Sequence, residues 1–397
     1  MPAISFSLMN TVSTLKPDSL EARRYNRLKR WLEVSDLIVG FVLLLALVLT
    51  HGSARLRDLA YLASRQYYSI AVFMFVLFLL LISKVLSLPI DYYGFRLEHE
   101  FKLSNQKPGA WLWDELKGWL VGLVILTILV EVLYATIRLY PDYWWLVVWA
   151  VFIGFTVLLA QLAPVVLFPI FYRFEPLKND ALRERLVKLG EKAGTKVRGV
   201  YEWKISEKSK KANAALTGLG KTRRIIIADT LLENYSDDEI EAVLAHELGH
   251  HVHGHIAKGI LVQVGITFVG FWASHIILRY VVDQRQMFQS MSDFANLPLL
   301  ALIAAVLGLV LTPVLNAYSR YNERQADSYA WKSIPSVEPF VTSMHKLASQ
   351  NLAEENPARW IEVLFHSHPT IAKRVEAAEK WRERQAVPPS ETPATSV

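Results

Sequence analysis

Six long apolar runs are the feature that most constrains the fold of this chain. They cover residues 37–50, 69–88, 116–139, 143–170, 256–282 and 297–318. They account for a hydrophobic share of 52 % and a mean hydropathy of +0.24, which are high for a soluble protein. Such runs are typical of helices that cross a lipid bilayer. The sequence therefore predicts a mainly α-helical, polytopic membrane protein with about six transmembrane helices.

The charges before the first run predict its orientation. A basic cluster at residues 23–30 precedes it and favours a retained first span with the N-terminus in the cytoplasm. The short first run and the small residues at 52–54 also resemble a signal peptide, so cleavage is the alternative. Six spans from a cytoplasmic N-terminus put residues 171–255 and those after 319 on the cytoplasmic side. The segment 283–296 then lies on the opposite side and is excluded from any site shared with them.

The same runs divide the chain into four parts. Residues 1–34 form a cytoplasmic N-terminal segment, and residues 35–170 form a membrane region with four transmembrane helices. Residues 171–385 form a second domain, which the transmembrane helices at about 256–282 and 297–318 interrupt. Residues 386–397 are rich in Pro, Ser and Thr and predict a disordered tail.

Local patterns predict the elements between the spans. The segment 89–116 is predicted to be polar, and residues 175–193 a charged amphipathic helix. Residues 197–204 and 224–228 predict strands, and residues 210–220 an edge strand followed by a turn. The second domain should therefore contain a small β-sheet.

The pattern HExxH at residues 246–250 predicts a zinc site. Residues four apart on a helix lie roughly 40° apart around the axis and about 6 Å apart along it. His246 and His250 can therefore reach one tetrahedral zinc ion, with Glu247 beside it as the base for its water. Ser236 and Glu239 form a capping-box pattern, which predicts the helix independently of the motif.

A third ligand must come from elsewhere in the chain. The sequence contains no cysteine, so thiolate ligands are excluded. Glu323 and Asp327 follow the sixth apolar run and are four residues apart on a predicted helix. Glu323 has the ligand type of a catalytic His₂Glu zinc site. We expect Asp327 to hold a histidine ligand or to act in proton transfer.

These motifs together resemble those of the CAAX prenyl protease 1 family (type I CAAX prenyl endopeptidases), which is related to HtpX-like membrane zinc metallopeptidases. The resemblance covers roughly residues 88–377. It rests on the following motifs: Leu88-Pro89-Ile90-Asp91-Tyr92-Tyr93, Glu98-His99-Glu100-Phe101, residues 171–177, Asn213-Ala214, the HExxH, Glu323 with Asp327, Lys346-Leu347, Asn351-Leu352, Ser367-His368-Pro369-Thr370 and Arg374.

The resemblance implies roles that spacing alone does not. Asn213 and Ala214 match an edge segment that aligns a substrate backbone by strand addition. His368 and Arg374 match residues near the cleft, where they stabilise an oxyanion or hold a substrate carboxylate. It also implies a chamber enclosed by the spans. Eukaryotic members have seven spans, and this chain ends without a retrieval signal, so a prokaryotic cytoplasmic membrane is expected.

The sequence thus predicts a zinc metalloendopeptidase with one Zn²⁺ per chain, CAAX processing as its activity, and the active site toward the cytoplasm. Its partners would be the bilayer and a peptide or protein substrate that can carry a lipidated C-terminus. Nucleic acid is not expected, because a basic inner membrane face explains the net charge of +6. Two alternatives remain: an HtpX-like quality-control protease, and a zinc-binding membrane scaffold without catalysis.

Overall fold

The computed structural model describes residues 19–218 and 223–386 of the chain. Within these ranges, six helices or helix pairs are long and apolar enough to cross a membrane. They are α1 (Leu20–Leu49), α3 (Tyr68–Glu100), α4 (Pro108–Leu139), α5 (Trp144–Leu162) with α6 (Phe168–Phe171), α10 (His255–Arg279) and α11 (Leu297–Ser333). The prediction of a helical membrane protein with about six spans is confirmed. All but the first residue of the predicted disordered tail lie outside the described residues.

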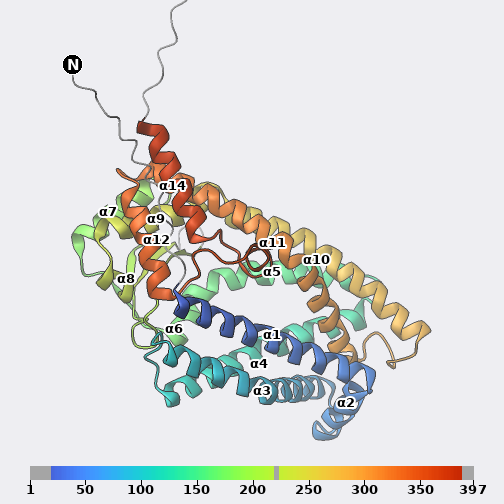
Figure 1. The fold of residues 1–397 in the computed structure, drawn as a ribbon. Helices are drawn as coiled ribbons and strands as arrows, with labels where there is room; N and C mark the ends of the chain where they lie inside the picture. The colour runs from blue at the N-terminus through green and yellow to red at the C-terminus, as the bar shows by residue number, and fades with distance from the viewer. Residues whose placement is uncertain (1–18, 219–222, 387–397) are drawn as a thin grey trace, which may run out of the picture.

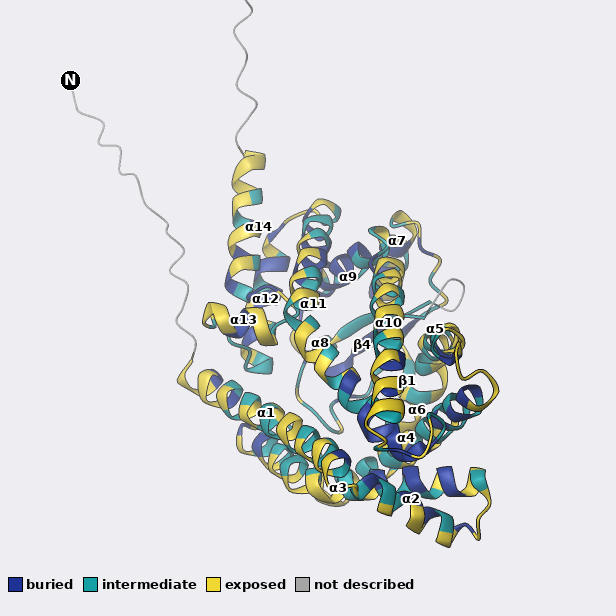
Figure 2. Ribbon diagram, turned by 90° about the vertical axis from the view of Figure 1, so that its right-hand side faces the viewer, coloured by how far each residue is buried: buried dark blue, intermediate teal, exposed yellow. Residues whose placement is uncertain are grey.

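The remaining helices gather mainly at one end of the molecule (Figure 1). They are α7 (Asp180–Lys192), α8 (Asp229–Asn234), α9 (Asp237–Val252), α12 (Glu338–Asn351), α13 (Arg359–Phe365) and α14 (Ile371–Ala386). The short helix α2 (Gly52–Ala63) lies at the opposite end. The outer sides of α1 and α10 are exposed along most of their length (Figure 2), as expected for helices that face lipid.

A four-stranded mixed sheet supports the helices of the second domain. Its strands are β1 (Phe174–Pro176), β2 (Val200–Trp203), β3 (Ala214–Thr217) and β4 (Arg224–Ala228), in the order β1-β2-β4-β3. β2 and β4 are parallel, whereas β1 and β3 pair antiparallel with their neighbours. β3 is therefore an edge strand, as its sequence predicted.

Two element bounds differ from the prediction. The helix of the second apolar run, expected to end at residue 88, continues as α3 through Pro89 to Glu100, and α4 begins at Pro108, so the polar segment 89–116 is mostly helical. The helix expected from residue 175 begins only at Asp180, because residues 174–176 pair with β2 as strand β1. The Asn179 side chain accepts a hydrogen bond from the amide of Leu182 and starts the helix there.

Candidate metal centre

Helix α9 begins at the capping box that the sequence predicted. The amide of Glu239 donates to the Ser236 hydroxyl at 3.3 Å, and the amide of Ser236 donates to the Glu239 carboxylate at 2.8 Å. The apolar stripe of the helix, which includes Ile240 and Leu248, is buried against the sheet domain. This fixes the rotation of α9, so that His246 and His250 face α11.

Gly249 allows α9 and α11 to cross in close contact. A Cβ atom built on Gly249 would lie 2.7 Å from Cα of Ala326 and 2.9 Å from its carbonyl oxygen. Both atoms belong to the backbone of α11, so they cannot rotate out of the way as a flexible side chain can. The glycine therefore brings the two histidines of α9 within reach of the acidic residues at 323 and 327.

Three side chains meet at this crossing. Nε2 of His246 lies 3.3 Å from Nε2 of His250 and 3.3 Å from Oε2 of Glu323, and Nε2 of His250 lies 3.2 Å from Oε1 of Glu323. Bonds of 2.0–2.1 Å to a tetrahedral zinc ion place neighbouring ligand atoms about 3.3–3.4 Å apart. The spacing of the three side chains therefore fits one zinc ion.

The carboxylate of Glu323 gives a second indication of a cation. Its Oε2 atom is buried and makes no hydrogen bond of good geometry within the described ranges, although Nε2 of His246 lies 3.3 Å away. A buried carboxylate oxygen without a donor costs free energy unless a positive charge lies beside it. Two imidazoles and a carboxylate are also the donor set of many catalytic zinc sites.

Asp327 and Arg374 contact His246 at Nδ1, the ring nitrogen that does not face Glu323. Oδ1 of Asp327 lies 2.8 Å from Nδ1 of His246, and Arg374 donates to both oxygens of Asp327 at 2.6 and 2.9 Å. Burial lowers the pKa of His246, but its contacts with Asp327 and Glu323 outweigh this and raise the pKa to about 9. A metal must therefore displace a proton from His246, so its affinity falls as the pH falls.

A second chain of contacts holds the other histidine. Nδ1 of His250 lies 2.9 Å from Nδ1 of His255, whose Nε2 lies 2.9 Å from Oε1 of Gln325. The amide nitrogen of Gln325 donates to the hydroxyl of Tyr321, so its oxygen faces His255. Because that oxygen only accepts, Nε2 of His255 carries the proton, and Nδ1 of His255 accepts from His250. In a neutral His250 ring, Nε2 is then the nitrogen without a hydrogen, and it is directed at Glu323.

A pocket of about 230 Å³ opens beside the three side chains. Its lining contains all the remaining residues that the sequence singled out: Asn213, Ala214, Glu247, His368 and Arg374. Nε2 of His368 lies 3.3 Å from Oε1 of Glu323. Burial raises the pKa of Glu247 above its usual value, which makes its carboxylate a stronger base. The structure thus brings every predicted site residue to one place.

Two models of known protein families match this chain. The sequence model described as "Peptidase family M48" matches residues 176–382. The chain belongs to this peptidase family. A second model, "CAAX prenyl protease N-terminal, five membrane helices", matches residues 14–173. The described part of that region holds four helices that can cross a membrane, because α2, with 12 residues, is too short.

Individual proteins show how far the similarity extends. "Uncharacterized metalloprotease YhfN" of Bacillus subtilis is 30 % identical over 95 % of this chain and 89 % of its own length. "CAAX prenyl protease 1" of Saccharomyces cerevisiae is 28 % identical over 77 % of this chain and 71 % of its own. The crystal structure of S. mikatae Ste24p has the same fold, with a TM-score of 0.82 and 24 % identity over 90 % of this chain and 88 % of that one. The M48 protein described here is an integral-membrane metalloprotease, and its predicted family resemblance is confirmed.

Three residues of the M48 site were missed in the sequence: Gly249, His255 and Gln325. His255 belongs to a histidine-rich stretch that directly follows the motif, and Gln325 lies between the two acidic residues of α11. Gly249 is a glycine in the middle of a helix, where it weakens the helix unless the packing requires it. Each of the three residues is therefore noticeable in the sequence. Only the crossing of α9 and α11 shows what each contributes to the site.

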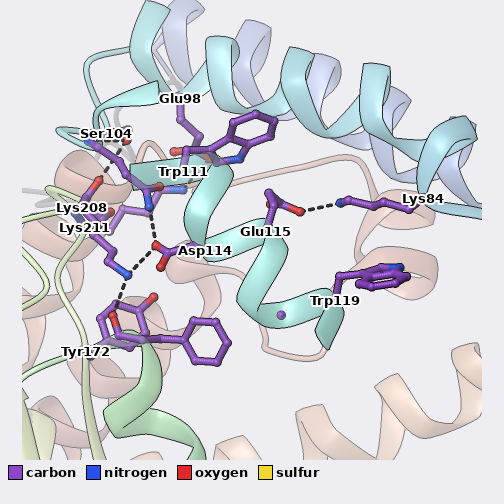
Figure 3. Close-up of a pocket in the computed structure, with 14 residues that line it drawn as sticks. Lys84, Glu98, Ser104, Trp111, Asp114, Glu115, Trp119, Tyr172, Lys208 and Lys211 are labelled. Carbon is purple, nitrogen blue, oxygen red and sulfur yellow. Dashed lines mark hydrogen bonds and ion pairs between the residues drawn. The ribbon is translucent and has the colours of Figure 1, made fainter. Parts of the chain in front are cut away.

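A second cavity of about 630 Å³ lies apart from the metal centre, between α3, α4 and the segment around Lys208 (Figure 3). Lys84 pairs there with Asp91 and Glu115, and Lys208 with Asp114. The lysine in the second apolar run is thus paired with two acidic side chains and offers no unpaired positive charge to a ligand.

We expect Gly249→Ala to force α9 and α11 apart. Overpacking of this kind destabilises a protein by about 1–3 kcal/mol and would also widen the spacing of the ligands. The metal content and the unfolding temperature of the purified variant should both fall. Gly259→Ala is the matched control, because a Cβ atom on this glycine of α10 meets nothing within 4 Å. Equal metal content and stability in the two variants would contradict the role given to Gly249.

Proposed function

We propose that this M48 protein is a zinc metalloendopeptidase that removes C-terminal peptides from CAAX-type substrates. The observation that carries the proposal is the meeting of three side chains, whose nearest donor atoms lie 3.2–3.3 Å apart, beside a pocket lined by Glu247 and by Ala214 of the edge strand. His246, His250 and Glu323 would hold one zinc ion. A bound zinc ion would supply Lewis acidity, which polarises a peptide carbonyl and lowers the pKa of a water molecule. That water then loses a proton more easily and becomes a better nucleophile.

The side chains around the ligands suggest how the protein performs hydrolysis. Glu247 accepts a proton from the attacking water and delivers it to the leaving amine. Asp327 acts through His246, since it holds the ring by Nδ1 and leaves Nε2 free to bind. His368 lies on the open side of the site, where its imidazole can donate to the developing oxyanion. Arg374 contributes mainly by neutralising Asp327 in the buried site.

The edge strand β3 supports recognition of an extended peptide. The residues that lead into β3 are held by Asn351, whose side-chain oxygen accepts a hydrogen bond from the amide of Ala212 at 2.9 Å. One side of β3 pairs with β4, and the other side remains available for strand addition. This arrangement would place the peptide bond of a bound substrate beside Glu247.

The shape of the pocket supports a small aliphatic side chain in the substrate. Beyond the catalytic residues, it is lined by the apolar side chains Leu231, Val243, Met344, Leu347 and Ile371. A CAAX sequence carries aliphatic residues at its two central positions. A pocket of about 230 Å³ with this apolar lining has room for one such side chain.

The same proposal includes the arrangement of the protein in the cell. Residues 171–385 would form the metallopeptidase domain, interrupted by α10 and α11, with its active site toward the cytoplasm. The basic cluster in the first turns of α1 supports this side, and the bacterial relative supports a prokaryotic membrane. Nucleic acid has no place in this function.

A cleavage assay tests the substrate class. Purified protein in nanodiscs is incubated with a farnesylated CAAX peptide, with the same peptide lacking the lipid, and with an unfolded membrane protein. We expect release of the C-terminal tripeptide, which mass spectrometry measures. We also expect the lipidated peptide to be cleaved faster than the peptide without the lipid. Glu247→Gln, which should bind but not cleave, serves as the inactive control. Cleavage of the unfolded protein alone would favour quality control, and cleavage of none would favour a scaffold.

A further inference from the structure

Helix α13 exposes an apolar face that the rest of residues 19–218 and 223–386 leaves uncovered. Trp360 is 61 % exposed and Leu364 44 %, and Val363 and Phe365 are also exposed. Residues 360, 363 and 364 share one face of a helix, since they are three and four positions apart. The opposite face carries the buried Ile361 and Glu362. A group of large apolar side chains on a helix this short is typical of an interaction surface.

The position of α13 is fixed by the end of the sixth span. Asn316 of α11 donates to the carbonyl of Leu364 at 2.9 Å. One turn further, Arg320 donates to the carbonyls of Glu362 and His366 at 3.0 and 2.7 Å, which holds the C-terminal end of α13 against α11. Both residues lie where the apolar run of α11 gives way to polar sequence. The helix is thus held at the boundary of the membrane-spanning region.

The attachment of α13 puts its exposed face at the end of a membrane span. Asn316, which donates to the carbonyl of Leu364, lies within the apolar run 297–318. Figure 2 shows α13 at the rim of the molecule, with most of its outer side exposed. Tryptophan is enriched where a membrane protein meets the interface between lipid and water. An occupant of this surface would therefore lie at the level where the sixth span ends and would contact the side chain of Trp360.

We propose that α13 lies in the lipid–water interface and inserts Trp360, Val363 and Leu364 into the leaflet on the side of the metal centre. It acts as a short interfacial helix within the peptidase domain. The bilayer is favoured over a protein partner because α13 is hydrogen-bonded to the last turns of an apolar run that crosses the membrane. This contact does not depend on the substrate class proposed above.

The contact has a consequence for the active site. The chain leaves α13 at Phe365 and reaches His368 three residues later, where Nε2 of His368 lies 3.3 Å from Glu323. The leaflet surface is therefore only a few residues from the metal centre. A substrate anchored in the bilayer would meet the site without leaving the membrane surface.

A spin label measures this contact directly. The chain contains no cysteine, so Leu364→Cys can be labelled alone without further changes. The labelled protein is reconstituted in vesicles of phosphatidylcholine and phosphatidylglycerol. Collisions of the label with oxygen, which concentrates in lipid, are compared with those with a water-soluble nickel chelate. Lys188→Cys on α7, an exposed position on a charged helix, is the aqueous control.

We expect the ratio of oxygen to nickel accessibility at residue 364 to be several-fold higher than at residue 188. Trp360→Cys on the same face should give the same result, which protects the test against a misfolded single variant. A ratio equal to that of the aqueous control would overturn the proposal. Low accessibility to both reagents, with dipolar broadening between labels, would also overturn it, because it would identify a second copy of the chain as the occupant.

Discussion

Replacement of Glu247 by glutamine will lower the rate of peptide cleavage by about 10²–10⁴-fold, the range that a positioned general base contributes. The substitution keeps the size of the side chain but removes its ability to accept a proton. The metal content should not fall, because Glu247 is not among the three side chains whose donor atoms meet. Turnover and metal analysis of the same preparation separate these two effects.

Glu241→Gln is the matched control for this variant. Glu241 lies on the same helix, but its carboxylate pairs with Arg185 outside the pocket. We expect it to cleave at the rate of the unmodified protein. Since burial raises the pKa of Glu247, the unmodified enzyme should lose activity as the pH falls through that pKa and the base becomes protonated. Wild-type turnover by Glu247→Gln would show that the role given to this residue is wrong. If the variant is inactive but intact, it can also trap natural substrates for identification.

Replacement of Glu323 by alanine will instead remove the metal. This carboxylate supplies one of three donor atoms, and its loss leaves two imidazoles that cannot complete the site. Loss of a residue that only orients a ligand typically costs about 10–100-fold in metal affinity, so loss of a ligand should cost more. Elemental analysis and competition with a chelator measure the affinity without any reference to activity.

Two further variants make the test of Glu323 specific. Asp327→Asn should weaken metal binding less than Glu323→Ala, because it loosens the hold on His246 but removes no ligand. Glu338→Ala removes an exposed acidic residue that pairs with Arg382 on the surface, and it should bind the metal normally. A Glu323→Ala protein that retains one metal ion per chain would exclude this residue as a ligand.

The architecture could be predicted largely from local sequence. Crossing a bilayer requires a long apolar helix, so the spans were visible as uninterrupted runs. Their exact ends were not, because α3 continues through Pro89 into a polar stretch and α11 continues past its apolar run to Ser333. A helix that leaves the membrane is stabilised by contacts with its neighbours, and these contacts have no signature in hydropathy. Strand β1 was missed for a similar reason, since pairing with β2 decides its conformation.

The chemistry of the site was also predictable at the level of residue types. HExxH on a capped helix determines that two imidazoles and a carboxylate share one face, whatever the rest of the fold. Six spans place residues 171–255 and those after 319 on the same side of the membrane. A third ligand therefore had to come from one of these two parts of the chain. This requirement favoured Glu323, which the structure brings within 3.3 Å of both histidines.

The sequence by itself therefore determined the membrane spans, the helix that presents the motif, and the kinds of side chain available to a metal. Only the tertiary structure decided that Gly249 brings α9 against Ala326, that His255 and Gln325 set the proton on His250, and that α13 lies at the end of the sixth span. The physical reason is distance along the chain. Helical geometry relates residues a few positions apart, whereas a metal site and a membrane contact depend on how separate helices pack, which no local pattern encodes.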